Sequence, residues 1–258
     1  MSLETQIAAL VSAANTLTAA VNGKIAEINT RVNQSFADFT SWKNTVQAKD
    51  INGRPQYKQT IDLTGLPTDY FYPVWWLTPG NSEGESSLVI YRDFRQDASL
   101  DPFKDGSSYV GGVNLQIDGC GNAWDGGANY LHIKRLSQTY RKHVRSIAFR
   151  VLAIARKVNG VKPLYNNLVD GQVTTSPNFS GVYLRGGLTY HIVKSFPGNV
   201  LFSKVDSEVS IYETVSADFE IKYTVRPWHK DAPELGADYG EYKLPYSYDL
   251  DTRYSKVV

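Results

Sequence analysis

An apolar residue recurs every three or four positions from Leu3 to Val46, and this spacing constrains the fold more than any other feature of the chain. An α-helix turns once every 3.6 residues, so the spacing places these apolar side chains along one face of a helix. No proline interrupts the pattern before Pro55. We therefore predict one long helix over residues 3 to about 47.

A helix of this length extends roughly 65 Å at about 1.5 Å per residue, too far for its own C-terminal domain to cover one side. We predict that several copies of the chain bury the apolar face, called the seam below, in a coiled coil. An amphipathic helix folded back on its own domain is the alternative. The predicted seam consists of Leu3, Ile7, Leu10, Leu17, Val21, Ile25, Ile28, Val32, Phe36 and Phe39.

The number of helices in the coil is open from the residues. Consecutive steps of four at positions 17, 21 and 25, and again at 28, 32 and 36, are stutters that locally unwind a left-handed supercoil. Leucine on one row with β-branched residues on the other favours two helices. The bulky side chains of Phe36, Phe39 and Trp42 widen the C-terminal part of the seam, which favours three helices.

After Pro55 the apolar period changes to two and turn residues recur, which is typical of short β-strands. Many strands without intervening helices predict an antiparallel β-sandwich. The domain boundaries follow as a stalk over residues 1–50, a sandwich over 51–228, and an extended tyrosine-rich arm over 229–258. The predicted strands are residues 57–63, 72–77, 87–94, 113–118, 130–136, 146–157, 181–184, 188–194, 207–214 and 219–226.

Composition narrows the classes of function. The net charge is only +1 and no dense basic run is present, which argues against nucleic-acid binding. Cys120 is the only cysteine, so the chain has neither an intrachain disulfide nor a CxxC metal site. Neither a secretory leader nor an apolar run of about eighteen residues is found, so we expect a protein made in the cytoplasm without membrane insertion.

Catalytic motifs are absent from the sequence. It contains no GxSxG, HExxH or P-loop pattern, and no internal repeat of the kind that builds depolymerase β-helices. Its four histidines are scattered, with no HxH pair. We expect a protein that is not an enzyme and holds no metal or other cofactor.

The segment over residues 118–129 is rich in Gly, Asn and Asp and contains Trp124. An indole offers a flat face to a sugar ring, and Asp125, Asn122 and Asn129 could bond its hydroxyls. A glycine-rich hairpin loop is the structural alternative. The segment lacks the spacing and closing Glu of an EF-hand calcium loop.

A basic cluster lies between two predicted strands and includes Arg135, Arg141, Lys142 and Arg145. Guanidinium forks match phosphate oxygens, so Arg141 and Lys142 are candidates for contact with lipopolysaccharide phosphates. A solvated turn is the alternative.

Three stretches resemble the receptor-binding domains of bacteriophage tail fibres. They are residues 60–66 with 72–74, residues 89–92, and residues 181–190, and an N-terminal coil is also typical of that family. The resemblance implies a homotrimer on the virion, made in the host cytoplasm. It implies attachment to a phage tail or baseplate protein at the N-terminal end and binding to a bacterial surface glycan or protein, often the lipopolysaccharide of a Gram-negative host.

These observations predict a tail fibre that mediates host recognition and adsorption. The alternative is a purely structural virion part, such as a collar or neck fibre or a tail connector, with the same coil and sandwich but no receptor. Binding to host cells and blocking of phage adsorption distinguish the two functions.

Overall fold

The computed structural model describes residues 2–45, 48–49, 55–80, 84–96, 109–121, 129–138, 143–236 and 242–243, with side chains left undescribed at 39–49, 95–96, 109–110 and 242–243. The chain divides into two compact units, Met1–Ala48 and Lys49–Val258. Each unit is described by itself below.

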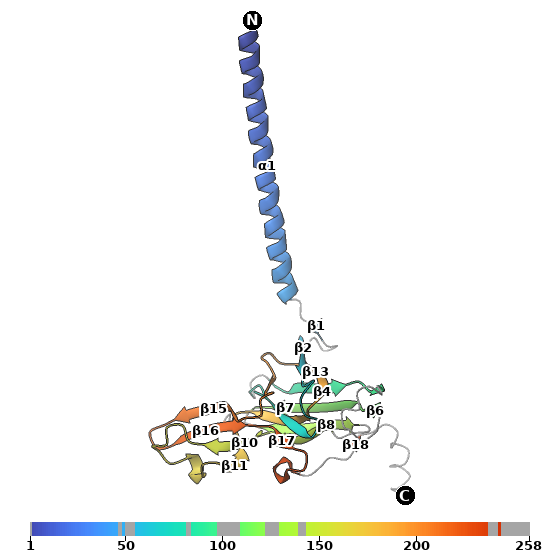
Figure 1. The fold of residues 1–258 in the computed structure, drawn as a ribbon, viewed down its shortest axis with the longest axis vertical. Helices are drawn as coiled ribbons and strands as arrows, with labels where there is room; N and C mark the ends of the chain where they lie inside the picture. Colours follow the sequence, from blue (N-terminus) through green and yellow to red (C-terminus); the bar gives the residue numbers. More distant parts are fainter. Residues whose placement is uncertain are drawn as a thin grey trace. The chain divides into compact units, whose positions relative to one another are not determined.

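The first unit is the single helix α1, Leu3–Thr45, which confirms the predicted long helix (Figure 1). Ser2 begins it, because its Oγ accepts a hydrogen bond from the Thr5 backbone N–H at 3.3 Å. The described side chains of the predicted seam, from Leu3 to Phe36, are each 45–71% exposed. The Phe39 side chain lies outside the described residues. Nothing in this single chain covers the described part of the seam.

The second unit is mainly β, as predicted, and its named strands pair antiparallel throughout. A seven-stranded sheet has the order β1-β2-β13-β4-β7-β8-β18, and a four-stranded sheet has the order β11-β10-β16-β15. A five-stranded sheet has the order β14-β3-β12-β9, with β17 also on β3. The strands are β1 Ala48–Lys49, β2 Pro55–Asp62, β3 Tyr70–Trp76, β4 Ser86–Arg92, β5 Arg95–Gln96, β6 Tyr109–Val110, β7 Val113–Cys120, β8 Tyr130–Gln138, β9 Val144–Ala148, β10 Leu152–Arg156, β11 Val173–Thr175, β12 Ser180–Arg185, β13 Thr189–Lys194, β14 Leu201–Phe202, β15 Val209–Val215, β16 Glu220–Val225, β17 Trp228–His229 and β18 Tyr242–Lys243.

The five-stranded sheet lies between two hydrophobic cores. Alternate residues of β3 point to opposite faces, so Tyr72 and Val74 enter the core shared with the seven-stranded sheet. Phe71 and Trp75 enter the core shared with the four-stranded sheet. The domain therefore has three β layers, where the sequence predicted the two layers of a sandwich.

Two connections between layers lie against each other. The chain passes from β2 to β3 and, later, from β12 to β13, and β2 pairs with β13 while β3 pairs with β12. The Gly186 N–H donates to the Tyr70 carbonyl and the Gly187 N–H to the Leu63 carbonyl, each at 2.9 Å. A Cβ on Gly186 would lie 2.3 Å from the Pro67 carbonyl oxygen, so the turn requires glycine there.

The pairings bring together the sequence stretches 60–66, 72–74, 89–92 and 181–190. Residues 60–66 and 181–190 meet across β2–β13 and the two connections, and residues 89–92 in β4 pair with β13. Arg185 in this unit is used internally, because its Nε donates to the Thr68 carbonyl at 2.6 Å.

Two sequence predictions for the β domain are corrected. The predicted strand 146–157 is two strands, β9 and β10, which lie in different sheets because a bend at Phe149 and Arg150 separates them. The described start of the predicted arm, residues 229–236, packs on the second core, whereas residues 237–241 and 244–258 of that arm lie outside the described residues. Trp228 and Leu235 are buried there, and η4 spans Pro233–Leu235.

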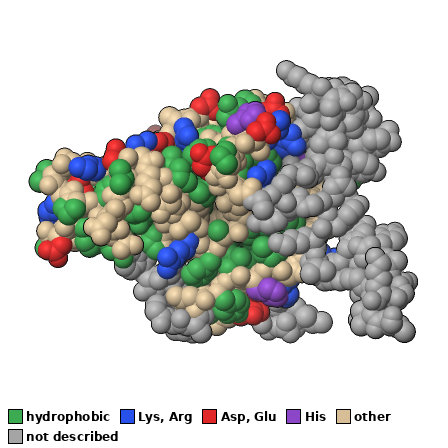
Figure 2. Space-filling view, turned by 90° about the horizontal axis from the view of Figure 1, so that it is seen from below, with side chains coloured by type: hydrophobic (Ala, Val, Ile, Leu, Met, Phe, Trp, Pro, Cys, Tyr) green, Lys and Arg blue, Asp and Glu red, His purple; other side chains and the backbone are tan. Residues whose placement is uncertain are grey.

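Among the described residues, no helix has the length and apolar character that a membrane span needs. On the face of the β domain drawn in Figure 2, positive and negative side chains lie in small mixed groups with apolar side chains between them.

Candidate functional site

The outer face of the seven-stranded sheet carries a shallow hollow near the open end of the β7–β8 hairpin, where β7 begins and β8 ends. Leu88 and Ile90 of β4 point into the core, so the alternating residues Val89 and Tyr91 point outward. The hollow has a volume of about 560 Å³. Its lining is Val89, Tyr91, Arg92, Asp93, Phe94, Gly112, Val113, Asn114, Ser137 and Val193, and it is called the sheet-face hollow below.

Aromatic side chains form one part of the sheet-face hollow. Tyr91 lies opposite His191 of β13, with ring centroids 5.4 Å apart and ring planes tilted by 40°. The His191 Nδ1 lies 3.4 Å from Thr60 Oγ1, which helps to fix the imidazole that supports Tyr91. Phe94 is 47% exposed. Two rings are thus presented to solvent, and one of them is held from behind by the sheet.

Polar groups form the other part of the hollow. Asn114 and Ser137 are direct cross-strand partners on β7 and β8. The Asn114 Oδ1 is shielded from water and has no hydrogen-bond partner within the described part of the chain. Asp93 is exposed beside them. The hollow therefore offers an amide, a hydroxyl and a carboxylate next to its aromatic rings.

The rim of the hollow is held by Arg92. Its Nη1 donates to the carbonyl oxygens of Asp93 at 2.9 Å and Gly111 at 2.7 Å, which ties the two chain segments of the rim together. Gly112 lets them approach closely, because a Cβ there would lie 3.1 Å from the Arg92 carbonyl oxygen. A rim fixed in this way is preorganised, which lowers the ordering cost of binding.

This set of groups suits a saccharide. Sugar C–H faces stack on aromatic rings, and sugar hydroxyls need directional donors and acceptors. A volume of a few hundred Å³ fits one or two sugar units in a largely preformed site.

The glycine-rich segment predicted to bind the receptor joins β7 to β8 and is therefore a hairpin loop. Its base is tied down: the Tyr130 hydroxyl donates to Glu85 at 2.8 Å, and the Gly121 N–H donates to the Pro79 carbonyl. Asn129 is half-buried directly before β8. Asn122, Trp124 and Asp125 lie outside the described residues. The described strand ends that flank this segment, Cys120 and Tyr130, lie at the opposite end of β7 and β8 from Asn114 and Ser137, roughly 20 Å away at about 3.3 Å per residue.

The predicted basic cluster is divided between buried and undescribed residues. Arg145 is buried and donates to the backbone carbonyls of Lys230 at 3.2 Å and Gly236 at 2.6 Å. It therefore fastens the segment after β17 to the domain and is not free to meet a phosphate. Arg141 and Lys142 lie outside the described residues, and Arg135 is half-buried on β8.

Metal-binding clusters are absent from the described ranges, where no three His, Cys, Asp or Glu residues gather. His143 is fully buried, and its backbone N–H donates to Gln138 Oε1 at 2.9 Å. His132, His191 and His229 are exposed at separate positions.

A scan against protein-family models finds no match, and searches of curated proteins and of solved structures find none either. The function is therefore inferred from the residues of this chain alone.

Proposed function

We propose that the chain is a bacteriophage tail-fibre protein that binds a bacterial surface polysaccharide, with lipopolysaccharide as the expected receptor. The observation that carries the proposal is the uncovered seam of α1, joined in one chain to a β domain with a saccharide-type hollow. The stalk serves assembly and display, and the β domain serves recognition.

Burial of the seam favours association of identical chains. Full burial of one Leu, Ile or Val side chain stabilises by about 1.5–3 kcal/mol, and the helix exposes such side chains along its length. The charged pairs Lys24–Glu27 and Arg31–Glu27, at 2.8 and 2.9 Å, use positions off the seam and leave it apolar. We propose that two further copies of this chain cover the seam and make a homotrimer.

A trimer can attach firmly to a bacterial surface through binding sites that are each weak. A single shallow saccharide site binds weakly, but linked sites on one fibre raise the overall affinity by roughly 10²–10⁴-fold when they engage one surface together. A bacterial surface presents the same glycan many times, which suits such binding. The N-terminal end of the stalk is then the end for attachment to a phage tail or baseplate protein, and the mature location is the virion.

Cell binding tests the proposal directly. Fluorescently labelled full chain is incubated with intact cells from a panel of Gram-negative strains that display different polysaccharides. We expect strong binding to a subset of strains, loss of binding to mutants that lack the outer polysaccharide, and blocking of adsorption by the phage that carries the fibre. An oligomer that binds no strain and blocks no adsorption would instead support a structural collar or connector protein.

Single substitutions locate the site. Tyr91→Ala removes a ring of the sheet-face hollow and is expected to weaken cell binding at least several-fold with little change in thermal midpoint. Tyr70→Ala is the matched control, because Tyr70 on β3 is partly exposed, contacts the His229 ring as Tyr91 contacts the His191 ring, and does not line the hollow.

Trp124→Ala tests the hairpin loop that the sequence favoured. Weakened binding in Trp124→Ala with unchanged binding in Tyr91→Ala would move the site to that loop and remove the sheet-face hollow from the proposal.

A further inference from the structure

A second hollow lies on the four-stranded sheet, within residues 143–236, which the structure describes without a gap. Its volume is about 190 Å³, smaller than the sheet-face hollow. The lining combines a cation, an amide, two threonines and two tyrosines. It consists of Arg150, Tyr165, Asn166, Leu168, Thr174, Thr175, Pro177 and Tyr223, and it is called the Arg150 hollow below.

Within the described residues, the Arg150 guanidinium has no hydrogen-bond or ion-pair partner. Arg145, Arg156 and Arg185 each donate to described carbonyl or carboxylate groups. Arg150 is exposed, and across residues 143–236 and the other described ranges no hydrogen bond or ion pair is found for its side chain. An arginine fork carries five N–H donors, so its full capacity for an anion remains available.

Two strands of the sheet contribute residues to the Arg150 hollow. Thr174 pairs with Ala153, and Tyr223 pairs with Ala155, so these four side chains share one face of β11, β10 and β16. Both alanines are buried in the second core, and Thr174 and Tyr223 on the strands to either side of β10 line the hollow. Tyr165 closes one side and is held against Phe219, with ring centroids 4.8 Å apart.

Polar groups of neutral charge complete the lining. Thr174, Thr175 and Asn166 supply hydroxyl and amide donors, and no Asp or Glu is among the residues that line the hollow. Asn166 and its neighbour Asn167 have left-handed φ angles of 54° and 57°, which turn the chain sharply within η3 (Tyr165–Asn167). The site thus has one positive charge, hydrogen-bond donors and no opposing negative charge.

We propose that the Arg150 hollow binds an anionic group of a surface glycan, either the carboxylate of a uronic acid or a phosphate ester. Both groups present the paired oxygens that a guanidinium fork matches. That a glycan carries the anion rests on the proposed function, whereas anion binding itself rests on the hollow alone. In the assembled fibre this subsite distinguishes acidic from neutral polysaccharides.

Saturation-transfer NMR on the full chain tests the inference, because it detects weak ligands of large proteins. The probes are methyl β-D-glucuronoside, methyl phosphate and the neutral methyl β-D-glucoside. We expect transfer to one or both anionic probes, at least tenfold stronger than any transfer to the glucoside at equal concentration. Transfer to only one anionic probe identifies the carboxylate or the phosphate as the source.

Substitutions distinguish binding in the Arg150 hollow from general attraction of anions to the protein's positive charges. Arg150→Met is expected to abolish the transfer without lowering the thermal midpoint, because the side chain has no hydrogen-bond or ion-pair partner among the described residues. Arg150→Lys keeps the charge without the fork and is expected to weaken transfer severalfold. Lys157→Met removes an exposed positive charge just beyond β10, away from the lining, and is expected to change nothing.

Equal transfer to glucuronoside and glucoside, no transfer to either anionic probe, or full transfer in Arg150→Met would overturn the anion site. These outcomes are distinct from failure of the fibre proposal. Wild-type chain that still binds cells while the anionic probes show no transfer would leave the fibre standing and remove only the Arg150 hollow.

Discussion

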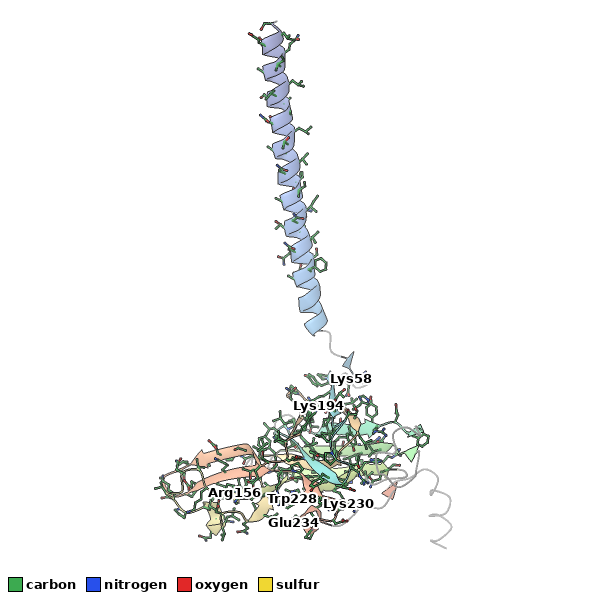
Figure 3. The ribbon with its side chains drawn as sticks, viewed as in Figure 1. Lys58, Arg156, Lys194, Trp228, Lys230 and Glu234 are labelled. Atoms are coloured by element: carbon green, nitrogen blue, oxygen red, sulfur yellow. The ribbon has the colours of Figure 1, made fainter. Side chains whose placement is uncertain are left out.

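Glu208 shows how a single side chain contributes to the stability of the four-stranded sheet. Its carboxylate accepts two hydrogen bonds from the Arg156 guanidinium, at 2.9 and 2.5 Å, and one from the Thr224 hydroxyl at 2.7 Å. The Arg156 hydrogen bonds, foremost, lower the pKa of Glu208 from 4.5 to about 2. Figure 3 shows Arg156 in the part of the domain that contains β10, β15 and β16.

Glu208→Gln is expected to lower the free energy of unfolding at pH 7 by about 1 kcal/mol, since a half-exposed charge-assisted pair is lost. A carboxylate with a lowered pKa stabilises the fold above its unfolded pKa, and that contribution is lost as pH falls toward about 2. Urea unfolding at pH 7 and pH 3 should therefore show a smaller difference between wild type and variant at pH 3.

Glu213→Gln is the control for this prediction. Glu213 lies 3.6 Å from Lys222 on the same sheet and is more exposed, so its loss should change stability less. A pH-independent difference for Glu208→Gln would contradict the assigned ion pair.

Lys194 is almost fully buried, and its ammonium donates to the carbonyl oxygens of Phe196, at 2.7 Å, and Gly198. Burial lowers the pKa of Lys194 below 10.5, so the unfolded chain binds more protons than the folded chain just below that pH. Stability from this group therefore rises with pH up to about 10.5. Unfolding free energies of wild type and Lys194→Met should diverge in favour of wild type between pH 8 and pH 10, and parallel curves would refute the lowered pKa.

Burial of individual residues was partly predictable from the sequence. Trp75 and Trp76 fall in the predicted strand 72–77 and are buried, as a core strand requires. Arg145 was expected in an exposed basic cluster, but it is buried against carbonyls of residues 85 and 91 positions later in the chain. Local sequence contains no signal for partners so distant. Tyr91 and Phe94 were not singled out from the sequence, although Tyr91 alternates with the core residues Leu88 and Ile90 in the predicted strand 87–94, which places it on the outer face.

At the scale of elements, β12 crosses the second core at Gly181. A Cβ there would lie 2.3 Å from Val151 Cγ2 and 2.8 Å from the Val74 carbonyl oxygen. Gly181→Ala is expected to destabilise the β domain by about 1–3 kcal/mol through overpacking. In a double-mutant cycle, adding Val151→Ala should recover part of the lost free energy of unfolding. If Gly181→Ala left the free energy of unfolding unchanged, the layers would be less tightly packed than described.

The stalk is tested by Ile25→Asp and Ile28→Asp. Each places a carboxylate in the proposed seam, which costs several kcal/mol per chain when unpaired, and symmetry repeats the cost in every copy. Light scattering is expected to show loss of a species of three times the 28.8 kDa chain mass, with the β-sheet circular dichroism retained. Thr30→Asp, about 200° around the helix from Ile28, is the control and should assemble normally. A wild-type mass of two chains would support a coiled coil but contradict the proposed trimer.

Elements with a strong period were predicted well from the sequence. Helix α1 and strands such as β2, β3, β4 and β13 follow the predicted ranges closely. The division of residues 146–157 was missed, because Ile147, Phe149 and Val151 keep the apolar alternation across the bend at Phe149 and Arg150. The two-residue strands β14 and β17 were missed because they are too short to show a period and depend on pairing with β3.

At the scale of the whole molecule, the number of β layers could not be obtained from periodicity. The run from Phe71 to Trp76 is apolar at most positions because both faces of β3 are buried. Such a run predicts a buried strand without saying which sheets cover it. The contacts that decide this join segments far apart in the chain.

The central proposal is that the stalk makes the fibre multivalent and that the β domain holds the receptor. Dissociation from host cells, measured for wild type and Ile25→Asp at equal chain concentration after dilution, tests both parts together. We predict that wild type remains bound and that Ile25→Asp is released at least about 100-fold faster. Equal dissociation of the two proteins, or binding by neither to any strain, would contradict the proposal.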